Sequence, residues 1–189
     1  EVLAQDEINR MSDPKVLTKL EAIGALTEIE KIKALIREGE SKKLEFKETL
    51  SLNVEKQTKE KYLETSALKT LVAFLNSDGG NLLVGVSDTG VVTGLNKEIE
   101  KFDSTRDNFL KRWKNLIKEH IGEPFYPFID YRLIDVDGKI VLNVECQPSP
   151  KFECYLDKKY FYVRTNPATD KLEGPKLVEY VKNRFPSPA

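Results

Sequence analysis

Hydrophobic and polar positions along the chain change period several times, and these changes predict where helices and strands lie. Apolar residues recur at four-residue spacing from Leu63 through Leu71 to Leu75, which predicts a mostly buried helix over roughly 59–75. A polar, glycine-bearing turn ends this helix. The next run, 82–86, is apolar on both faces, as expected of a central strand that is covered on both sides.

The N-terminal part of the chain carries a weaker pattern. Residues 1–26 are polar with a thin apolar stripe, which fits a helical arm, a linker from an upstream domain, or a helix packed on its own domain. Thr27 and Glu30 have the spacing of a capping box, and Gly39 ends the helix that follows. We therefore expect 1–26 to be an arm or linker and 27–186 to form one domain.

A short strand is expected after this helix. Leu44 and Phe46 alternate with charged residues, which predicts that one face of the strand enters the core. Because side chains two positions apart on a strand point the same way, Glu45 and Lys47 share the opposite face.

The remaining elements are shorter or less periodic. Ser104 is a good N-cap for a second long helix. The expected elements are a hairpin joining 82–86 to 91–94, a helix over 104–121, strands at 128–134 and 139–146, a hairpin joining 152–156 to 160–164, and a helix over 174–185.

The composition narrows the class of protein. The chain has 189 residues, of which 40% are hydrophobic, and a net charge of -1, so it has enough apolar material for one core but no overall positive field. Its two cysteines and single histidine form neither a zinc pattern nor a disulfide framework, and a reducing, cytoplasmic setting is expected. No apolar run is long enough for a transmembrane helix.

The two adjacent glycines of the turn, Gly79 and Gly80, do not predict a nucleotide site. They follow a helix and precede a strand, which is the reverse of the order in a phosphate-binding loop. Gly79 is expected to take a positive φ at the helix end. ATP hydrolysis is therefore disfavoured.

Three stretches of the sequence are distinctive when taken together. They are Glu40-Ser41-x-x-Leu44-Glu45-Phe46-Lys47, then Ala73-Phe74-x-Asn76-x-x-Gly79-Gly80-x-Leu82-x-Val84-Gly85-Val86-x-Asp88-x-Gly90, and finally Tyr162-Val163-Arg164-Thr165 followed by Thr169. This series resembles the Schlafen AlbA-type domain family, also described as a DNA-binding domain of bacterial and archaeal regulators. The resemblance covers roughly 27–185 and implies an α+β fold with a mixed β-sheet flanked by helices.

The same resemblance implies nucleic-acid binding. In Schlafen proteins two such lobes of one chain form a clamp that cleaves structured RNA such as tRNA with a triad of carboxylates. The positions that match this triad are Glu40, Glu45 and Asp88. This chain has one lobe, so a comparable clamp would need a homodimer.

The residues themselves allow two interpretations of these acids. Metal-assisted cleavage of a phosphodiester needs oxygen ligands for Mg²⁺ or Mn²⁺, which Glu40, Glu45 and Asp88 would supply. Lys47 would then help to position the attacking water or stabilise charge. Alternatively, Glu45 and Lys47 are a solvated strand face and Asp88 is a turn residue.

Basic residues supply candidate phosphate contacts. They are Lys42 and Lys43 beside the first strand, Lys111, Lys114 and Lys118 on the second long helix, and Arg164 with Thr165 at the end of a late strand. For the helix, a solvated charged face is the alternative. Arg164 is expected to hold phosphate, because an arginine that ends a strand is well placed for that contact.

The sequence thus predicts a domain that binds DNA or structured RNA, either as a transcriptional regulator or as part of a larger one, and that forms a homodimer. One alternative is a Mg²⁺- or Mn²⁺-dependent endoribonuclease that uses the triad. The other is a protein-interaction module in which the charged residues are only structural. A metal cofactor is expected only for the nuclease.

Overall fold

The structure is a computed structural model that describes residues 15, 16 and 27–185. The chain divides after Gly39 into two units, 1–39 and 40–189. In the first unit, helix α3 (Glu28–Glu38) begins with the predicted capping box, because the Thr27 amide donates to Glu30 Oε2 at 2.7 Å and the Glu30 amide donates to Thr27 Oγ1 at 3.3 Å. The predicted arm lies almost entirely outside the described residues, and the domain start at Thr27 stays a prediction.

The second unit is built on a four-stranded sheet in the order β1-β4-β6-β5. Its strands are β1 (Leu44–Lys47), β4 (Gly80–Val84), β6 (Lys139–Cys146) and β5 (Ile129–Val136). Strand β1 runs parallel to β4, whereas β6 pairs antiparallel with both β4 and β5. The sheet is therefore mixed, and the predicted α+β fold with flanking helices is confirmed.

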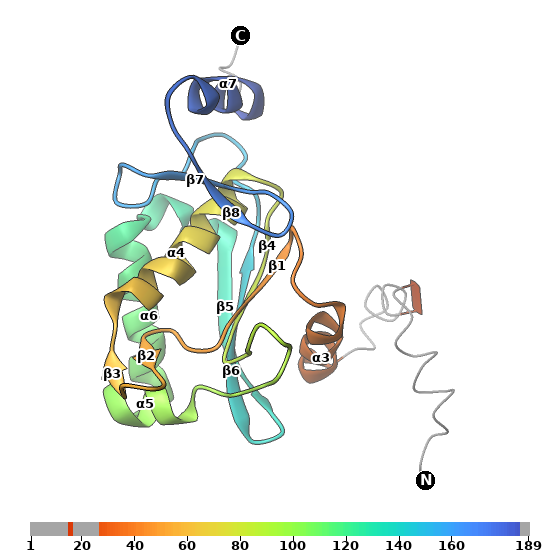
Figure 1. Ribbon diagram of the computed structural model, residues 1–189, viewed down its shortest axis with the longest axis vertical. Coiled ribbons are helices and arrows are strands. Elements are labelled where there is room, and N and C mark those ends of the chain that lie inside the picture. The colour runs from red at the N-terminus through yellow and green to blue at the C-terminus, as the bar shows by residue number, and fades with distance from the viewer. Residues whose placement is uncertain (1–14, 17–26, 186–189) are drawn as a thin grey trace. The chain divides into compact units, whose positions relative to one another are not determined.

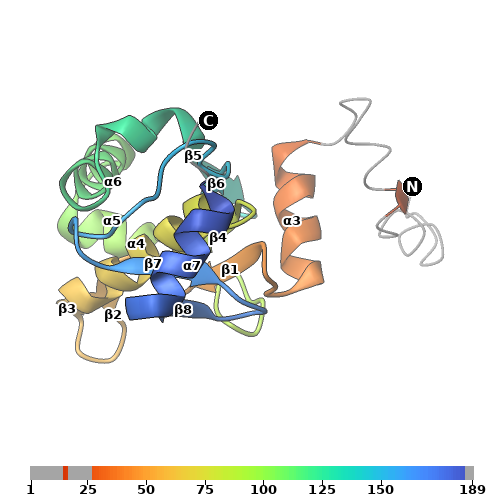
Figure 2. The same cartoon turned by 90° about the horizontal axis from the view of Figure 1, so that it is seen from above.

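Two long helices, α4 (Lys61–Asn76) and α6 (Arg106–His120), lie on the same side of this sheet (Figures 1 and 2). Their apolar faces meet the sheet in one core, in which Leu71, Phe74 and Trp113 have no exposed surface. The broad apolar stripe of α4 predicted this burial. Within the described part of the chain, no helix is both long enough and apolar enough to cross a membrane.

A second, two-stranded sheet lies between α4 and the last helix. It pairs β7 (Phe161–Arg164) with β8 (Thr169–Leu172), and α7 (Gly174–Arg184) follows. The Phe161 ring packs against the Tyr180 ring of α7 at a centroid distance of 5.8 Å, while Tyr162 belongs to the core that α4 helps to build. The alternating side chains of β7 thus join α7 to the main core.

The hairpin predicted between 82–86 and 91–94 is present but shorter than predicted, with the Ser87 amide donating to the Val91 carbonyl at 2.9 Å. Strand β4 ends at Val84, and a single bridge between Val86 and Val92 replaces the expected ladder. The cause is Gly85, which has a φ of 102° and accepts hydrogen bonds from the amides of both Thr93 and Gly94. That conformation interrupts the strand but still folds the chain back.

Of the hairpin predicted between 152–156 and 160–164, the turn is confirmed, because the amides of Leu156 and Tyr160 donate to each other's carbonyls at 2.8 and 2.9 Å, but the strand ladder is not. Only Leu156 and Tyr160 form a bridge, and β7 pairs with β8 instead. The backbone of Cys154 cannot join a strand ladder, because its amide and its carbonyl are both bound by the side chain of Asn76.

The start of α6 needs a smaller correction. The N-cap is Thr105, whose Oγ1 accepts from the Asn108 amide at 3.2 Å, whereas Ser104 precedes it with a φ of 66°. Five elements were not predicted: β8, β2 (Leu52–Asn53), β3 (Thr58–Lys59), α5 (Asn96–Phe102) and the 3-10 helix η1 (Glu123–Phe128).

Candidate nucleic-acid interface

The polar turn between α4 and β4 is a junction for buried hydrogen bonds. The Asn76 side chain has no exposed surface, and its amide nitrogen donates to the carbonyls of Cys154 at 2.8 Å and Tyr162 at 2.9 Å. Its oxygen accepts from the Cys154 amide at 2.8 Å. One side chain therefore fixes both β7 and the segment that precedes it against the end of α4.

The glycines of the same turn let separate backbone segments approach. Gly79 and Gly80 have φ values of 72° and 157°. A Cβ atom on Gly79 would come within 2.5 Å of the Cys146 carbonyl oxygen, and one on Gly80 within 2.7 Å of the Lys43 carbonyl oxygen. The ends of β6 and β1 could not meet the turn if either glycine carried a side chain.

Arg164 reaches this junction from the end of β7. Its side chain has no exposed surface. The guanidinium donates to Glu45 Oε2 at 2.8 Å, Thr169 Oγ1 at 2.9 Å, and the carbonyl oxygens of Ser41 at 2.7 Å and Lys42 at 3.2 Å. The prediction that Arg164 holds phosphate is not supported by this position, because the guanidinium is buried and serves to join β1 to the β7–β8 hairpin.

Glu45 and Lys47 share one face of β1, as predicted, and their side chains form an ion pair. Glu45 therefore accepts from two cations, Lys47 through Oε1 and Arg164 through Oε2. Its negative charge is already compensated by groups of this chain, which leaves little need for a metal ion at this carboxylate.

The other two acids of the predicted triad are placed differently. Glu40 Oε1 accepts from the Phe46 amide at 2.9 Å, and Asp88 is exposed in the turn beyond the end of β4. Within the described part of the chain, no three Asp, Glu, His or Cys side chains gather as a metal ion would require. In this arrangement the three acids do not form a site for Mg²⁺ or Mn²⁺. The metal triad, and the catalytic role of Lys47 that depends on it, stay predictions.

Two of the predicted phosphate contacts already have acidic partners. Lys42 Nζ lies 2.6 Å from Asp78 Oδ2, and Lys118 Nζ lies 2.7 Å from Glu123 Oε1. The hydrogen bond within each pair is the largest cause of a raised lysine pKa and a lowered carboxyl pKa. All four side chains are exposed, so a phosphate group can compete for either lysine at a small energetic cost.

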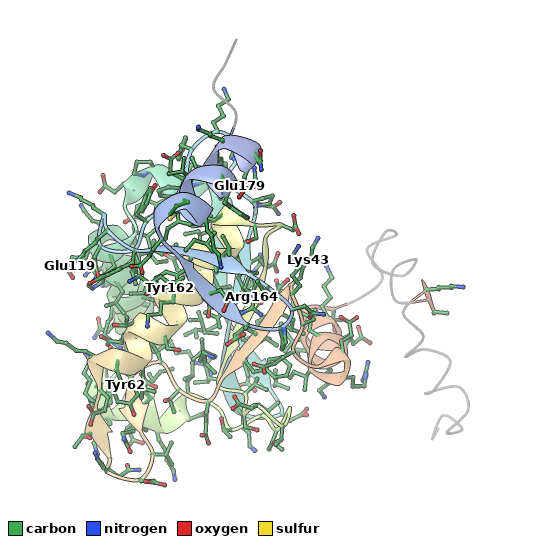
Figure 3. The ribbon with its side chains drawn as sticks, turned by 45° about the horizontal axis from the view of Figure 1, so that its top comes forward. Lys43, Tyr62, Glu119, Tyr162, Arg164 and Glu179 are labelled. Carbon is green, nitrogen blue, oxygen red and sulfur yellow. The ribbon has the colours of Figure 1, made fainter. Side chains whose placement is uncertain are left out.

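The remaining predicted contacts do not form one surface. Lys43 and Lys111 are exposed, Lys114 lies 5.8 Å from the centroid of the Tyr126 ring, and Thr165 Oγ1 donates to Asp170 Oδ2 at 2.7 Å. Figure 3 shows Lys43 and Glu119, which belongs to α6, on opposite sides of the molecule. The lysines near β1 and the lysines of α6 are therefore two separate candidate surfaces.

A buried charged cluster was missed by sequence reasoning. Arg112 makes a bidentate contact with Asp103 at 2.8 and 2.9 Å and also donates to Glu64 at 3.0 Å, Glu98 at 3.1 Å and Ser51 at 3.0 Å. Burial is the largest influence on the pKa of Arg112 and lowers it, but the acids outweigh burial and the net shift is upward. This cluster ties α4, α5 and α6 together, and the Arg112 side chain at its centre is only 14% exposed.

A group of lysines around two tyrosines was also missed. Lys69 Nζ lies 5.6 Å from the centroid of the Tyr162 ring. Lys159 and Lys171 lie 5.0 and 4.7 Å from that of Tyr160. The adjacent pair Lys159-Tyr160 was a signal in the sequence, but Lys69 and Lys171 reach these rings only through the tertiary fold.

The class of fold is defined by two features. These are a mixed sheet with helices on one side and the glycine turn that leads into the central strand β4. A family model described as Schlafen, AlbA_2 matches residues 40–173, and the chain belongs to this family. Members of the family typically bind nucleic acid.

The fold has a counterpart among solved structures. The crystal structure of the DIP2311 protein from Corynebacterium diphtheriae matches with a TM-score of 0.53 and 16% sequence identity. The match covers 76% of this chain but 24% of that one, so the chain corresponds to less than a third of the other protein's length. At this identity the likeness concerns the fold alone.

Proposed function

We propose that this chain binds nucleic acid, either DNA or structured RNA, through lysines on its surface. The observation that carries the proposal is the family match over 40–173. The exposed lysines near β1 and on α6 support it, because ammonium groups that contact phosphates supply most of the affinity of such complexes. Since the net charge of the chain is -1, binding depends on a local basic surface and not on a long-range field.

The experiment is fluorescence anisotropy with labelled single-stranded DNA, duplex DNA and stem-loop RNA. Affinity should fall steeply as salt rises from about 50 to about 200 mM, because each phosphate contact releases counterions. The variant Lys42→Gln/Lys43→Gln tests the surface near β1. The matched variant Lys111→Gln/Lys114→Gln removes the same charge from α6. If none of the three ligands shows salt-sensitive binding, the proposal is wrong.

Nuclease activity is tested in the same samples with Mn²⁺ or EDTA. Asp88→Asn is the better variant for this purpose, because Asp88 is exposed in a turn and its replacement leaves the core intact. Glu45→Ala would leave the buried Arg164 without its acid and so confuse activity with folding. Cleavage that needs Mn²⁺ and is lost in Asp88→Asn would favour the endoribonuclease alternative. A homodimer and a role in transcription regulation stay predictions from the family resemblance.

A further inference from the structure

Three lysines from different parts of the chain converge on two tyrosine rings beside the β7–β8 hairpin. Lys69 comes from α4, Lys159 from the turn before β7, and Lys171 from β8, where it lies opposite Tyr162 in the strand register. We call these three lysines, with Tyr160 and Tyr162, the tyrosine–lysine row. Figure 3 labels Tyr162 and, further along the same strand, Arg164.

The positive charge of this row is largely uncompensated. Lys171 pairs with Glu173 at 2.5 Å, but the described residues place no carboxylate within ion-pair distance of Lys69 or Lys159. The other nearby acid, Asp157, is bound to His120 at 2.6 Å. This differs from Lys42 and Lys118, each of which has its own acid.

The lysines repel one another, and contacts with the aromatic rings offset part of this repulsion. A cation over an exposed ring gains about 0.5–1 kcal/mol. The row therefore places three ammonium groups around two tyrosine rings, and two of them, on Lys69 and Lys159, have no carboxylate partner among the described residues, which suits a polyanion.

The tyrosines add groups that an ordinary lysine cluster lacks. Among the described residues, no hydrogen bond engages the hydroxyl of Tyr160 or Tyr162. Burial raises the pKa of Tyr162, so its phenol is neutral and can donate a hydrogen bond. The Tyr160 ring is half-buried, and a flexible lysine that covers it can move aside without disturbing the core.

We propose that the tyrosine–lysine row binds single-stranded nucleic acid, an inference that rests on the proposed function and assigns it a site and a ligand class. The ammonium groups contact successive phosphates, and the tyrosine hydroxyls donate to phosphate oxygens. An unpaired base stacks on the Tyr160 ring once the lysine that covers the ring turns towards a phosphate. A single strand fits better than a duplex because the bases of a duplex are already stacked on one another.

Two sets of matched variants test this site. The row variant is Lys69→Gln/Lys159→Gln/Lys171→Gln. The variant Lys111→Gln/Lys114→Gln/Lys118→Gln removes the same charge from the competing candidate surface on α6. For the ring, Tyr160→Phe keeps the aromatic face and Tyr160→Leu removes it. Thermal unfolding of each variant shows whether the fold is intact.

Binding is measured by anisotropy of a labelled oligouridylate across a salt series. The row variant should reduce the slope of log K against log salt by about 2, because each lost single-strand phosphate contact removes about 0.7. Tyr160→Leu should weaken binding by about five- to a hundredfold, as expected for one lost base stack, while Tyr160→Phe stays close to the wild type.

The outcomes separate this inference from the proposed function. If the row variant keeps the wild-type slope while the α6 variant loses it, the site is wrong and the proposed function stands. If polyglutamate displaces the oligonucleotide as well as unlabelled oligouridylate does, the row takes acidic chains in general and the assignment to nucleic acid is wrong. If the wild type shows no salt-sensitive binding to any nucleic acid, the proposed function itself fails.

Discussion

Replacing Asn76 with alanine removes three hydrogen bonds from a site with no exposed surface. The carbonyls of Cys154 and Tyr162 and the amide of Cys154 then lose their partner. A buried polar group left without a hydrogen bond costs about 1–3 kcal/mol, so three such groups cost about 3–6 kcal/mol even if they partly relax. The total free energy of unfolding of a domain is about 5–15 kcal/mol. Asn76→Ala should therefore lose a large part of the stability.

The assay is urea unfolding followed by circular dichroism. With a slope of about 1–3 kcal/mol per molar urea, the midpoint of Asn76→Ala should fall by about 1 M or more at an unchanged slope. The control is Asn115→Ala, because Asn115 is exposed on α6 and makes no comparable contact. If Asn76→Ala loses less than about 1 kcal/mol, the buried junction does not hold the hairpin to α4 and the reasoning is wrong.

Three further results are expected. Arg112→Met should destabilise the fold by about 3–5 kcal/mol in the same urea assay, because it leaves buried carboxylates without their cation; a loss below about 1 kcal/mol would contradict this. Burial raises the pKa of the Cys146 and Cys154 thiols, so a thiol-reactive disulfide reagent should modify them rapidly only in denaturant, and fast reaction of the native protein would refute it. The hydrogen bond from Lys42 lowers the pKa of Asp78 in the folded protein. The pair therefore stabilises the fold at pH values above the unfolded pKa of Asp78, and this stabilisation is lost as the pH falls through the folded pKa. The melting temperatures of Asp78→Asn and wild type should converge at acidic pH, and their stabilities at neutral pH should differ by less than about 1 kcal/mol.

The parts of the fold that could be predicted are those in which apolar residues form a clear pattern along the chain. Helix α4 has a broad apolar stripe that leaves residues 70–76 buried, and strand β6 is a nearly continuous buried run; both patterns appear directly in the sequence. Strand β8 has no such signal, because three of its four residues are polar. It forms a strand only by pairing with β7 in the tertiary fold. Without β8, the preceding segment around Cys154 was the only apparent partner for β7.

The candidate site was harder to predict because its contacts join distant residues. A strand that ends in an arginine is typical of a phosphate site, and nothing in the sequence indicates that Glu45 and the carbonyls before β1 enclose Arg164. In the same way, Lys69 gave no functional signal on a helix, and it becomes notable only because β7 brings Tyr162 over it. Residue types were informative about chemistry, but only the fold shows which side chains are exposed.

The buried junction and the proposed site are connected through one strand. Asn76 holds the backbone of Tyr162, and the opposite neighbour of Tyr162 on β8 is Lys171. The position of the β7–β8 hairpin against α4, and so the approach of Lys69 to the Tyr162 ring, depends on this hydrogen bond within the buried junction. Asn76→Ala should therefore weaken oligouridylate binding even at temperatures where the variant is still folded, whereas Asn115→Ala should not. Equal binding by folded Asn76→Ala and wild type would show that the row assembles independently of the junction.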